Sequence, residues 1–551
     1  MSRKIVIVGG VAGGATAATR LRRLDEEAEI VLIERGEYIS FANCGLPYYI
    51  GGVIEERGKL LVQTVERMTE RFNLDIRVKS EVTTINRNQK TVTIHDLNTN
   101  QSYEENYDTL ILSPGASPIK PPIKGIEEAE HLFTLRNIPD TDRIKSFVDS
   151  EKPKRAVVIG GGFIGVEMAE NLAEQGIDVT IVEMANQLMG PIDFEMASIL
   201  HNHVKEKGIN LIFEDGVQEF ADKGKIVQLS SGMKLDTDMI MLSIGVQPEN
   251  KLAKQADLNL GTRGGIQVNE RMQTSDPNIF AIGDAIEVTD YINGQPVQIP
   301  LAWPANRQGR LVADYINGKD VRYNGTLGTS IVKVFDLTAA ATGNNEKTLK
   351  RLGIPYQVVH VHPGSHAGYY PGASPISLKL IFSPEDGKIL GAQAVGMDGV
   401  DKRIDVIAVA IKGNLTVFDL PDLELAYAPP YSSAKDPVNM AGYAASNLLD
   451  GATSNIQWHE LHQIVEDGSG LIVDVRDPKE FEAGHIPNAI NIPLDEIRNR
   501  IEEFPADKSI YVYCQVGLRG YLASRILLQH NRNAVNLDGG YKTYSAVYPT
   551  V

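Results

Sequence analysis

A strand, a glycine-rich turn, a helix and a second strand occur twice in the sequence, and this duplication constrains the fold more than any other feature. The first copy begins with the apolar run Lys4 to Val8, which predicts a buried parallel strand, and continues with GGVAGG from Gly9. The second copy begins at Ala156 and carries GGGFIG from Gly160. Each copy therefore predicts a βαβ unit that binds a dinucleotide.

The residues of the two turns are the expected contacts of the bound dinucleotides. Glycines allow a tight turn and let backbone N–H groups approach a pyrophosphate, while the helix N-terminus adds partial positive charge. The first copy has Val11 at the central glycine position, whereas the second matches G-x-G-x-x-G throughout. The predicted contacts are Gly9, Gly10, Ala12, Gly13, Gly14, Gly160, Gly162, Phe163, Ile164 and Gly165.

An acidic residue ends the second strand of each copy. Glu34, followed by Arg35, stands 20 residues after Gly14, and Glu183 stands 18 residues after Gly165. A carboxylate at this position bonds ribose hydroxyls, and in a nicotinamide site it repels a 2′-phosphate. We therefore expect one fold to hold a flavin and the other to hold NADH, with NADPH as a second donor.

Composition indicates an ordinary globular protein with several domains. The chain has 551 residues, of which 42% are hydrophobic and 23% are charged. Its formal net charge of −17 argues against nucleic acid as a general partner. No apolar run approaches about 18 residues, so no membrane partner is expected. Two cysteines, Cys44 and Cys514, are too few for a disulfide framework and predict a reducing, cytoplasmic compartment.

Over roughly residues 1–445 the sequence resembles the flavoprotein disulfide reductases that contain two dinucleotide-binding domains. The segment TSDPNIFAIGD from Thr274 is similar to the second flavin motif of that family, which implies FAD contacts at Gly283 and Asp284. The segments TLILSPGASP from Thr109 and MIMLSIGVQPE from Met239 resemble the crossings between the two nucleotide domains. The resemblance implies FAD, NAD(P)H and a homodimer.

The last hundred residues predict a separate small α/β domain, with strands at 471–475 and 510–514 and a helix at 521–529. This region resembles a rhodanese. The resemblance rests on DVRDPKEFEAGHIPNAINIP from Asp474, YCQVGLRGYLAS from Tyr513 and LDGG from Leu537, which occur in this order.

Together these features predict an α/β protein with two Rossmann-like domains, an α+β dimerisation domain and a rhodanese-like domain. Alternating strands such as 376–382 and 388–395, with a helix at 403–411, indicate the dimerisation domain. The expected boundaries are 1–110 and 276–325 for a discontinuous FAD-binding domain, 111–275 for the NAD(P)H-binding domain with its crossings, 326–445 for the dimerisation domain, 446–455 for a polar linker and 456–551 for the rhodanese domain.

Cys44, in SFANCGLPYYIGG, is a solitary redox candidate beside the expected flavin site. Family members with two redox cysteines place them a few residues apart, but here the next cysteine is Cys514. A lone thiol forms a mixed disulfide with a small thiol or a sulfenic acid, but no local dithiol. The resemblance therefore leaves coenzyme A disulfide reductases and NADH oxidases or peroxidases open. We expect a helix after Cys44 to lower the pKa of its thiol.

Thr16, Arg20 and Arg23 favour the coenzyme A reductases. Their spacing places them on one face of the first helix, which predicts a site for the phosphates of coenzyme A or, alternatively, a solvated basic face. In the coenzyme A disulfide reductases the matching residues look like substrate ligands. The resemblance adds three more substrate contacts, the last of them from the second subunit: Ser40, Asn43 and Lys435.

Four further residues are candidates for catalysis. Tyr369 and Tyr427 match two family tyrosines that reach the substrate thiol across the dimer, where a phenol can donate a proton; interface aromatics are the alternative. Cys514 precedes the loop QVGLRG, whose backbone N–H groups are expected to stabilise a thiolate or persulfide. Arg519 in this loop is expected to pair with an anionic sulfur donor.

The implied activity is reduction of coenzyme A disulfide, persulfide or polysulfide by NAD(P)H through FAD. Cys44 would form a mixed disulfide with coenzyme A, and Cys514 would carry sulfane sulfur. The alternatives are an NADH peroxidase or oxidase that uses a Cys44 sulfenic acid, and a non-catalytic sulfur carrier or redox sensor. No metal site is expected, because His459 and His462 have no third ligand nearby in the sequence.

Overall fold

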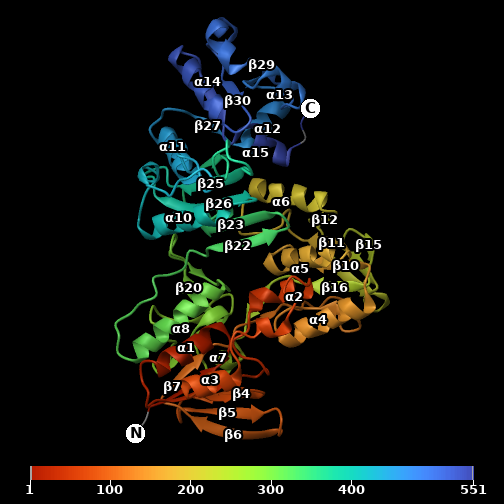
Figure 1. Ribbon diagram of the computed structural model, residues 1–551, viewed down its shortest axis with the longest axis vertical. Coiled ribbons are helices and arrows are strands. Elements are labelled where there is room, and N and C mark those ends of the chain that lie inside the picture. The colour runs from red at the N-terminus through yellow and green to blue at the C-terminus, as the bar shows by residue number, and fades with distance from the viewer. Residues whose placement is uncertain (1–2, 549, 551) are drawn as a thin grey trace. The chain divides into compact units, whose positions relative to one another are not determined.

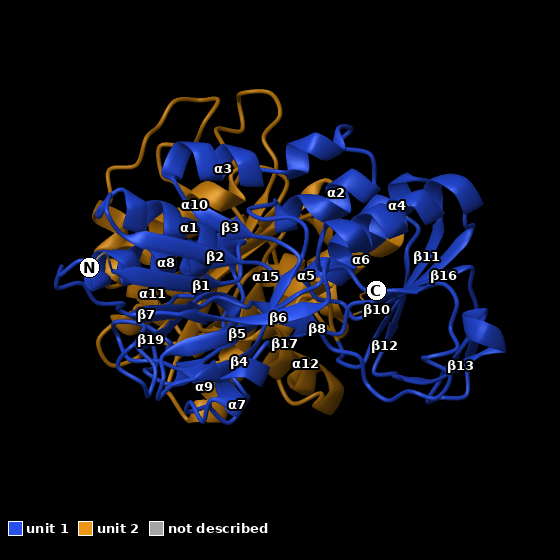
Figure 2. Cartoon of the chain, turned by 90° about the horizontal axis from the view of Figure 1, so that it is seen from below, with its two compact units in different colours: residues 1–186, 208–328 blue, residues 187–207, 329–551 orange. Residues whose placement is uncertain are grey.

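The computed structural model describes residues 3–548 and 550 (Figure 1). The chain divides into two compact units, residues 1–186 with 208–328 and residues 187–207 with 329–551 (Figure 2). Among the described residues, no helix combines the length and apolarity that crossing a bilayer requires.

The first unit contains a five-stranded parallel sheet built around the first glycine-rich turn. Its strands, in spatial order, are β19 (Ile279–Ala281), β7 (Thr109–Leu112), β1 (Lys4–Val8), β2 (Glu29–Ile33) and β3 (Asp75–Arg77). Helices α1 (Ala12–Arg22) and α8 (Ala302–Ile316) pack against each other. Strand β1 is apolar and buried from Ile5 to Val8, because both faces of a parallel sheet are covered. The sheet confirms the first predicted βαβ unit.

A second parallel sheet of the same unit contains the second glycine-rich turn. Its strands are β12 (Asn210–Phe213), β11 (Asp178–Glu183), β10 (Arg155–Ile159), β16 (Met239–Leu242) and β9 (Leu132–Phe133). Helix α5 (Phe163–Glu174) follows the turn. Both helices begin within the turn itself, because the last turn glycines already have helical geometry. Strand β11 ends at Glu183, as predicted.

Smaller elements complete this unit. One antiparallel sheet contains β4 (Ser80–Asn86), β5 (Thr91–Asp96) and β6 (Gln101–Asn106), and another contains β13 (Val217–Ala221), β14 (Ile226–Leu229) and β15 (Lys234–Asp236). Strand β8 (Ala116–Pro118) pairs with β17 (Val246–Pro248), and a further small sheet contains β18 (Ile266–Gln267), β20 (Ile286–Thr289) and β21 (Pro296–Val297). The helices α2 (Leu46–Ile50), α3 (Val65–Phe72), α4 (Ile138–Glu151) and α7 (Lys251–Gln255) also belong to this unit.

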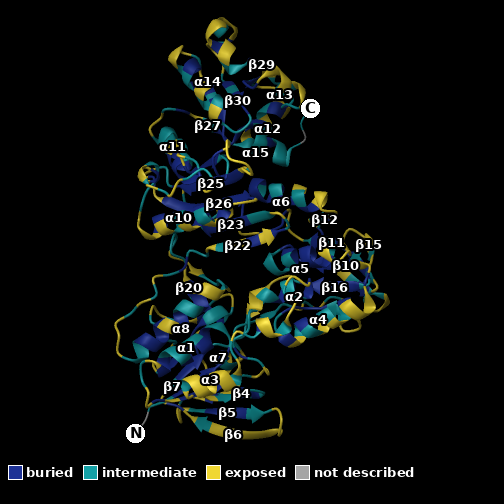
Figure 3. Ribbon diagram, in the orientation of Figure 1, coloured by how far each residue is buried: buried dark blue, intermediate teal, exposed yellow. Residues whose placement is uncertain are grey.

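The second unit contains an antiparallel sheet where the dimerisation domain was predicted. Its strands are β22 (Ser330–Val334), β23 (Leu337–Gly343), β26 (Ile389–Gly396), β25 (Ile376–Phe382) and β24 (Gln357–Val361). Every residue of β25 and β26 is buried (Figure 3). The surrounding helices are α9 (Glu346–Leu352), α10 (Val400–Lys412), α11 (Pro437–Leu449) and, from the nucleotide-binding region of the sequence, α6 (Phe194–Glu206).

The same unit contains the parallel sheet of the C-terminal region. Its strands are β27 (Asn455–Ile456), β31 (Ala534–Leu537), β30 (Ile510–Tyr513), β28 (Leu471–Asp474) and β29 (Ile490–Asn491). The helices are α12 (Trp458–Asp467), α13 (Pro478–Glu482), α14 (Leu518–Gln529) and α15 (Gly540–Val547).

The structure corrects the predicted linker at 446–455. Helix α11 continues to Leu449, and β27 at Asn455 already pairs with β31. Only the short turn between them lacks regular structure. The polar residues of this segment suggested a loop, but burial of Ala445 and hydrogen bonding along the helix extend α11.

Candidate active site

The two glycine-rich turns have the same backbone geometry. Gly9 has a φ of +99°, and a Cβ added there would lie 2.0 Å from the carbonyl oxygen of Ser113. A Cβ on Gly14 would lie 1.9 Å from the carbonyl oxygen of Gly9. In the second copy Gly160 has a φ of +106°, and a Cβ on Gly165 would lie 1.9 Å from the oxygen of Gly160. Each turn therefore requires glycine for the sharp bend and for close helix–strand packing.

The carboxylates that end the second strands are also held alike. Glu34 accepts a hydrogen bond from the N–H of Gly10 at 2.8 Å and from the N–H two residues after itself at 2.7 Å. Glu183 accepts from the N–H of Gly161 and from the N–H two residues after itself, both at 2.7 Å. Each carboxylate oxygen keeps a further lone pair, so both side chains remain able to accept hydrogen bonds from ribose hydroxyls.

A cavity of the first unit runs along the first turn. Of the predicted FAD contacts, it is lined by Gly9, Ala12, Gly13, Glu34, Arg35, Gly283 and Asp284. Gly10 and Gly14 instead support the turn from within. Burial raises the pKa of Asp284 to about 6, against the opposing charge of Arg136. The glycine turn, the anchored carboxylate and the half-buried Asp284 fit a dinucleotide that carries a ribityl chain.

The second turn also fits a dinucleotide. A Cβ added at Gly162 would meet no atom within 4 Å, so the central glycine borders open space where a pyrophosphate can approach the backbone. Phe163 and Ile164 begin helix α5 directly after it. This arrangement offers the helix N-terminus to the phosphates of a nicotinamide dinucleotide.

Cys44 lies in the short 3-10 helix Asn43–Gly45, immediately before α2. It is exposed, as is Asn43, which also lines the cavity along the first turn. Loss of hydration, followed by the charges of Glu167 and Asp284, raises the pKa of the Cys44 thiol. The prediction of a lowered pKa was therefore wrong, because loss of hydration and, after it, the charges of two carboxylates outweigh the N-terminus of a helix of only 5 residues.

Glu167 and Tyr48 also belong to the surroundings of Cys44, although no sequence motif indicated them. The hydroxyl of Tyr48 donates to Glu167 at 3.2 Å. Burial and the charge of Glu170 raise the pKa of Glu167 to about 7, although the Tyr48 hydrogen bond acts in the opposite direction. Glu167 follows the last turn glycine by two residues, and this spacing was the available signal. A carboxyl group that titrates near neutrality therefore lies beside Cys44.

Helix α1 positions the three predicted phosphate ligands differently. The hydroxyl of Thr16 donates to Asn306 at 2.6 Å. Nε of Arg20 donates to Asp314 at 2.8 Å, so its charge is already balanced within the unit. Nε of Arg23 donates to a backbone carbonyl on its own helix at 3.0 Å, and its side chain is exposed. Of the two arginines, Arg23 presents the less compensated charge.

The remaining predicted substrate contacts lie on exposed or half-buried loops. Ser40 has a φ of +44°, and its N–H donates to the carbonyl of Gly10 at 2.9 Å, which ties its loop to the first turn. Lys435 is exposed in the second unit, and its Nζ lies 5.9 Å from the centroid of the Tyr443 ring.

Tyr369 and Tyr427 come together in the second unit, although 58 residues separate them in the sequence. Their hydroxyl oxygens lie 2.7 Å apart. Both side chains are exposed, at 76% and 48%. The hydrogen bond to Tyr427 raises the pKa of Tyr369, so Tyr369 stays protonated and able to donate. The two phenols thus form one surface pair rather than two isolated aromatic residues.

Cys514 is buried directly after β30, at the start of the loop to α14. The carbonyl of Cys514 accepts from the N–H of Tyr541 at 2.7 Å, and the carbonyl of Gln515 accepts from the N–H of Lys542 at 3.0 Å. All described peptide bonds are trans, so the N–H groups that share these two peptide planes point away from α15. This orientation fits the expected loop that directs N–H groups toward a sulfur atom.

Arg519 has an internal partner that the sequence did not indicate. Its two terminal nitrogens each donate to a carboxylate oxygen of Glu480 at 2.7 Å. The expected pairing with an anionic sulfur donor would therefore have to compete with a bidentate ion pair.

Comparison with known proteins agrees with this geometry. A family model described as pyridine nucleotide-disulphide oxidoreductase matches residues 3–309, and the model of its dimerisation domain matches residues 329–437. The chain belongs to this oxidoreductase family. A rhodanese-like domain matches residues 457–547. The α/β fold with two nucleotide-binding domains, a dimerisation domain and a rhodanese domain is thereby confirmed, as is the use of FAD and NAD(P)H by the oxidoreductase family.

Relatives place this oxidoreductase on a particular branch of the family. A coenzyme A disulfide reductase of Staphylococcus epidermidis is 41% identical over 443 residues, which cover 80% of this chain and 99% of the relative. The crystal structure of reduced Bacillus anthracis CoADR-RHD is 65% identical, with a TM-score of 0.98, over 99% of this chain and 98% of that chain. The structure of an NAD-dependent persulfide reductase from A. fulgidus is 38% identical, with a TM-score of 0.92, over 98% and 100%. The predicted resemblance to coenzyme A disulfide reductases joined to a rhodanese is confirmed.

Proposed function

We propose that this chain is an NADH-dependent flavoenzyme that reduces the disulfide or persulfide of coenzyme A at Cys44, and that Cys514 carries sulfane sulfur. The observation that carries the proposal is a solitary exposed thiol next to a dinucleotide cavity, with no second cysteine nearby in the sequence. The relative named coenzyme A disulfide reductase supports coenzyme A as the exchange partner, and the relative named persulfide reductase supports a persulfide as substrate.

The Cys44 thiolate attacks one sulfur of coenzyme A disulfide. A mixed disulfide between Cys44 and coenzyme A forms, and one coenzyme A thiolate leaves and takes up a proton. When bound, FAD supplies a relay for the two electrons of NADH, which then cleave the mixed disulfide. In total, NADH, one proton and one disulfide give NAD⁺ and two coenzyme A thiols. With a persulfide as substrate, the products are one coenzyme A thiol and hydrogen sulfide.

The hydroxyl pair of Tyr369 and Tyr427 is the proposed proton donor to the leaving thiolate. It acts from the second subunit of a homodimer, because the family's dimerisation domain carries both tyrosines. Lys435 extends the anion site from the same subunit. Glu167 is the group that exchanges the proton of Cys44, since its pKa lies near 7.

Coenzyme A binds through Thr16, Arg23, Ser40 and Asn43, with Arg20 held in place by Asp314. An exposed Arg23 supports this assignment, since the chain otherwise carries a net negative charge. Glu183 favours NADH over NADPH, because its carboxylate disfavours a 2′-phosphate. A reducing cytoplasmic compartment suits a chain that depends on free thiols.

The rhodanese domain transfers sulfur without net oxidation. The Cys514 thiolate attacks the outer sulfur of a persulfide, the sulfur–sulfur bond of the donor breaks, and a new one forms on Cys514 while a thiol leaves. The bidentate pair with Glu480 reduces the charge that Arg519 can offer to an anionic donor. We therefore expect thiols carrying one sulfane sulfur to be better donors than small dianions.

Mass spectrometry of protein purified without reductant tests the proposal. We expect a coenzyme A adduct on Cys44, its loss in Cys44→Ser, and its retention in Cys514→Ser. Reduction of coenzyme A disulfide should follow the same pattern. Turnover with hydrogen peroxide or oxygen that exceeds turnover with coenzyme A disulfide would instead identify a peroxidase or oxidase. Sulfur loading of Cys514 without NADH turnover would identify a sulfur carrier.

A further inference from the structure

Two histidines of the dimerisation sheet contact the rhodanese domain within the second unit. The backbone N–H of His360, on edge strand β24, faces both carboxylate oxygens of Asp538, at 3.1 and 3.0 Å. Nδ1 of His360 lies 2.6 Å from the same carboxylate. Nε2 of His362 lies 2.8 Å from the hydroxyl of Thr543 on α15. Both histidines are buried, so these contacts are shielded from water.

A second carboxylate holds the other nitrogen of His360. Nε2 lies 3.1 Å from Glu195 of α6. An imidazole that faces carboxylates through both nitrogens can satisfy them only as the doubly protonated cation. Burial opposes this charge, but Asp538 and Glu195 outweigh it and raise the pKa of His360 to about 9. His362 differs, because burial, Lys542 and the charged His360 lower its pKa well below the usual range.

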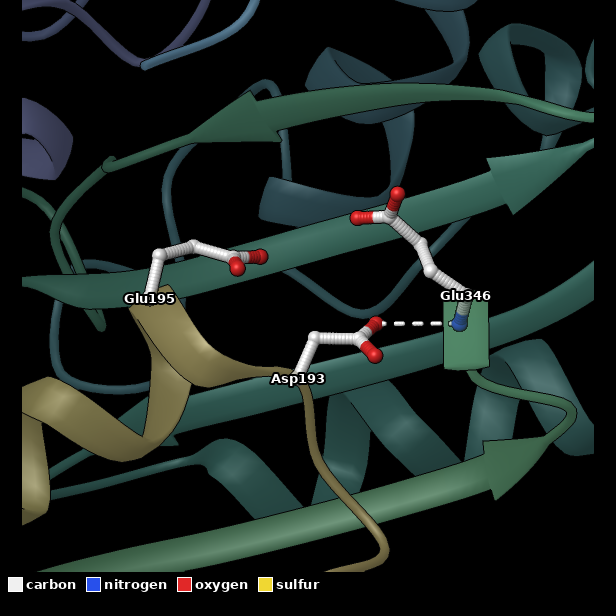
Figure 4. A group of neighbouring side chains, drawn as sticks. All are labelled: Asp193, Glu195 and Glu346. Carbon is white, nitrogen blue, oxygen red and sulfur yellow. Dashed lines mark hydrogen bonds between the residues drawn. The ribbon is translucent and has the colours of Figure 1, made fainter. Parts of the chain in front are cut away.

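Glu195 belongs to a group of three carboxylates with Asp193 and Glu346 (Figure 4). Asp193 accepts from the backbone N–H of Glu346 at 3.2 Å, shown as a dashed line. The fully buried ammonium of Lys379 bonds Glu195 and Glu346 and lies 3.0 Å from Asp193. Lys379 therefore occupies the position that a metal ion would need, and the cluster is an internal ion network. His360 joins this network to Asp538.

Asp538 is followed in the sequence by residues that contact the Cys514 loop. The next residues, Gly539 and Gly540, lie against both partners: a Cβ on Gly539 would lie 2.9 Å from the Cβ of His360, and a Cβ on Gly540 would lie 2.4 Å from the carbonyl oxygen of Cys514. The two N–H groups that bond the loop carbonyls follow on α15. A displacement of Asp538 would therefore move the groups that hold the loop.

We propose that His360 is a positioning residue for the sulfur site at Cys514. Its imidazolium fixes Asp538, and Asp538 fixes the start of α15 and through it the two carbonyls of the Cys514 loop. The inference rests on the proposed sulfur-carrying role of Cys514. It makes the rhodanese site depend on a residue of the dimerisation sheet, outside the domain that contains the reactive sulfur.

His360→Gln removes the charge and keeps a side chain that can hydrogen-bond. In the full-length protein, we expect persulfide formation on Cys514 from coenzyme A persulfide, followed by mass spectrometry, to slow by about 10-fold. Reduction of coenzyme A disulfide through Cys44 should change by less than about 2-fold. His530→Gln is the matched control, because His530 follows the far end of α14 and its Nδ1 lies beside a backbone carbonyl one turn earlier; it should change neither rate.

The pH dependence separates this role from a merely structural one. Wild type and His360→Gln have the same Cys514 thiol and use the same sulfur donor. The ratio of their rates of persulfide formation therefore reports the effect of His360 alone. The imidazolium is present below its pKa of about 9 and is lost above it. The ratio of wild type to variant should therefore fall from about 10 near neutral pH toward about 1 above pH 9. A ratio that does not change with pH overturns the proposal.

Hydrogen exchange gives a readout that needs no sulfur chemistry. The amides of Tyr541 and Lys542 should exchange about 10-fold faster in His360→Gln, while those of β28 should not change. Asp538→Asn should reproduce both effects, and the double variant should be no worse than either single one. The positioning role is overturned if His360→Gln leaves the exchange of these two amides or the sulfur loading of Cys514 unchanged. It is also overturned if the variant loses sulfur loading and coenzyme A disulfide reduction to the same extent. If wild type itself loads no sulfur on Cys514, the proposed sulfur carrier fails, and exchange alone decides the inference.

Discussion

At the residue scale, the surroundings of Cys44 decide its chemistry more than its place before a helix. The pKa of the thiol is raised by loss of hydration and by Glu167 and Asp284, so thiolate formation is linked to the protonation of those carboxyl groups. Burial brings the pKa of Glu167 to about 7 and that of Asp284 to about 6. A small change in pH near neutrality therefore changes the charge next to the sulfur of Cys44.

Glu167→Gln should make Cys44 more reactive. Removal of a nearby negative charge favours the thiolate and lowers the pKa of the thiol, so alkylation by iodoacetamide should accelerate about 2- to 10-fold. The gain should grow as pH rises through about 7, because Glu167 becomes ionised in the wild type over that range. Mass spectrometry of the Cys44 peptide over a pH series measures it. Glu174→Gln, exposed on the same helix, is the control; equal gains in both variants would contradict the assignment.

At the element scale, each nucleotide site is a strand, a glycine turn and a helix that must approach closely. The carbonyls of Ser113 and Ser243 lie where a side chain on Gly9 or Gly160 would be, whereas Gly162 borders open space. Glycine is therefore required at Gly9 and Gly160 for a different reason than at Gly162. Gly9 and Gly160 serve the packing of the turn, and Gly162 leaves room for the dinucleotide.

Gly160→Ala and Gly162→Ala separate these two reasons. Gly160→Ala should lower the free energy of unfolding by about 1–3 kcal/mol, because its φ is positive and its Cβ would lie 2.4 Å from the Ser243 carbonyl. Gly162→Ala should leave stability within about 0.5 kcal/mol and weaken NADH binding. Chemical denaturation and NADH titration measure the two effects. If both substitutions lowered the free energy of unfolding equally, the difference in contacts between Gly160 and Gly162 would not explain the stability of the turn, and this interpretation would be wrong.

At the scale of the whole molecule, buried charges connect segments that the sequence keeps far apart. Lys379 on β25 meets Asp193 and Glu195 near the start of α6 and Glu346 at the start of α9. Although burial opposes ionisation, Lys379 and His360 hold the pKa of Glu195 well below its usual range. The attraction among these groups helps to keep α6 with the dimerisation sheet rather than with the nucleotide-binding sheets that precede it in the sequence.

Lys379→Met should destabilise the second unit by about 3–5 kcal/mol near neutral pH, because it leaves buried carboxylates unpaired. In the wild type, the lowered pKa of Glu195 gives stability that is present above the unfolded value of 4.5 and is lost as pH falls through the folded value. In the variant the carboxyl pKa values rise, so stability should recover as pH falls.

Thermal unfolding from neutral pH down through and below 4.5, the unfolded value for Glu195, checks this reversal. Lys388→Met, an exposed change before the neighbouring strand β26, should keep the wild-type pH dependence. A variant at position 379 that loses stability on acidification, as the wild type does, would argue against an ion network that depends on this lysine.

The amino-acid sequence by itself determined the two βαβ units, the carboxylates at their strand ends, the rhodanese domain and the solitary thiol. Each of these features can be predicted from glycines, apolar residues or cysteines that lie close together in the sequence. The tertiary structure alone decided which charges meet: Glu167 beside Cys44, Glu480 on Arg519, Asp314 on Arg20, and His360 between Glu195 and Asp538. Pairings of this kind depend on distances between residues from separate elements, and no periodicity or spacing along one segment encodes them. For the same reason, the sequence singled out Cys44 as the candidate thiol but predicted the wrong direction for its pKa.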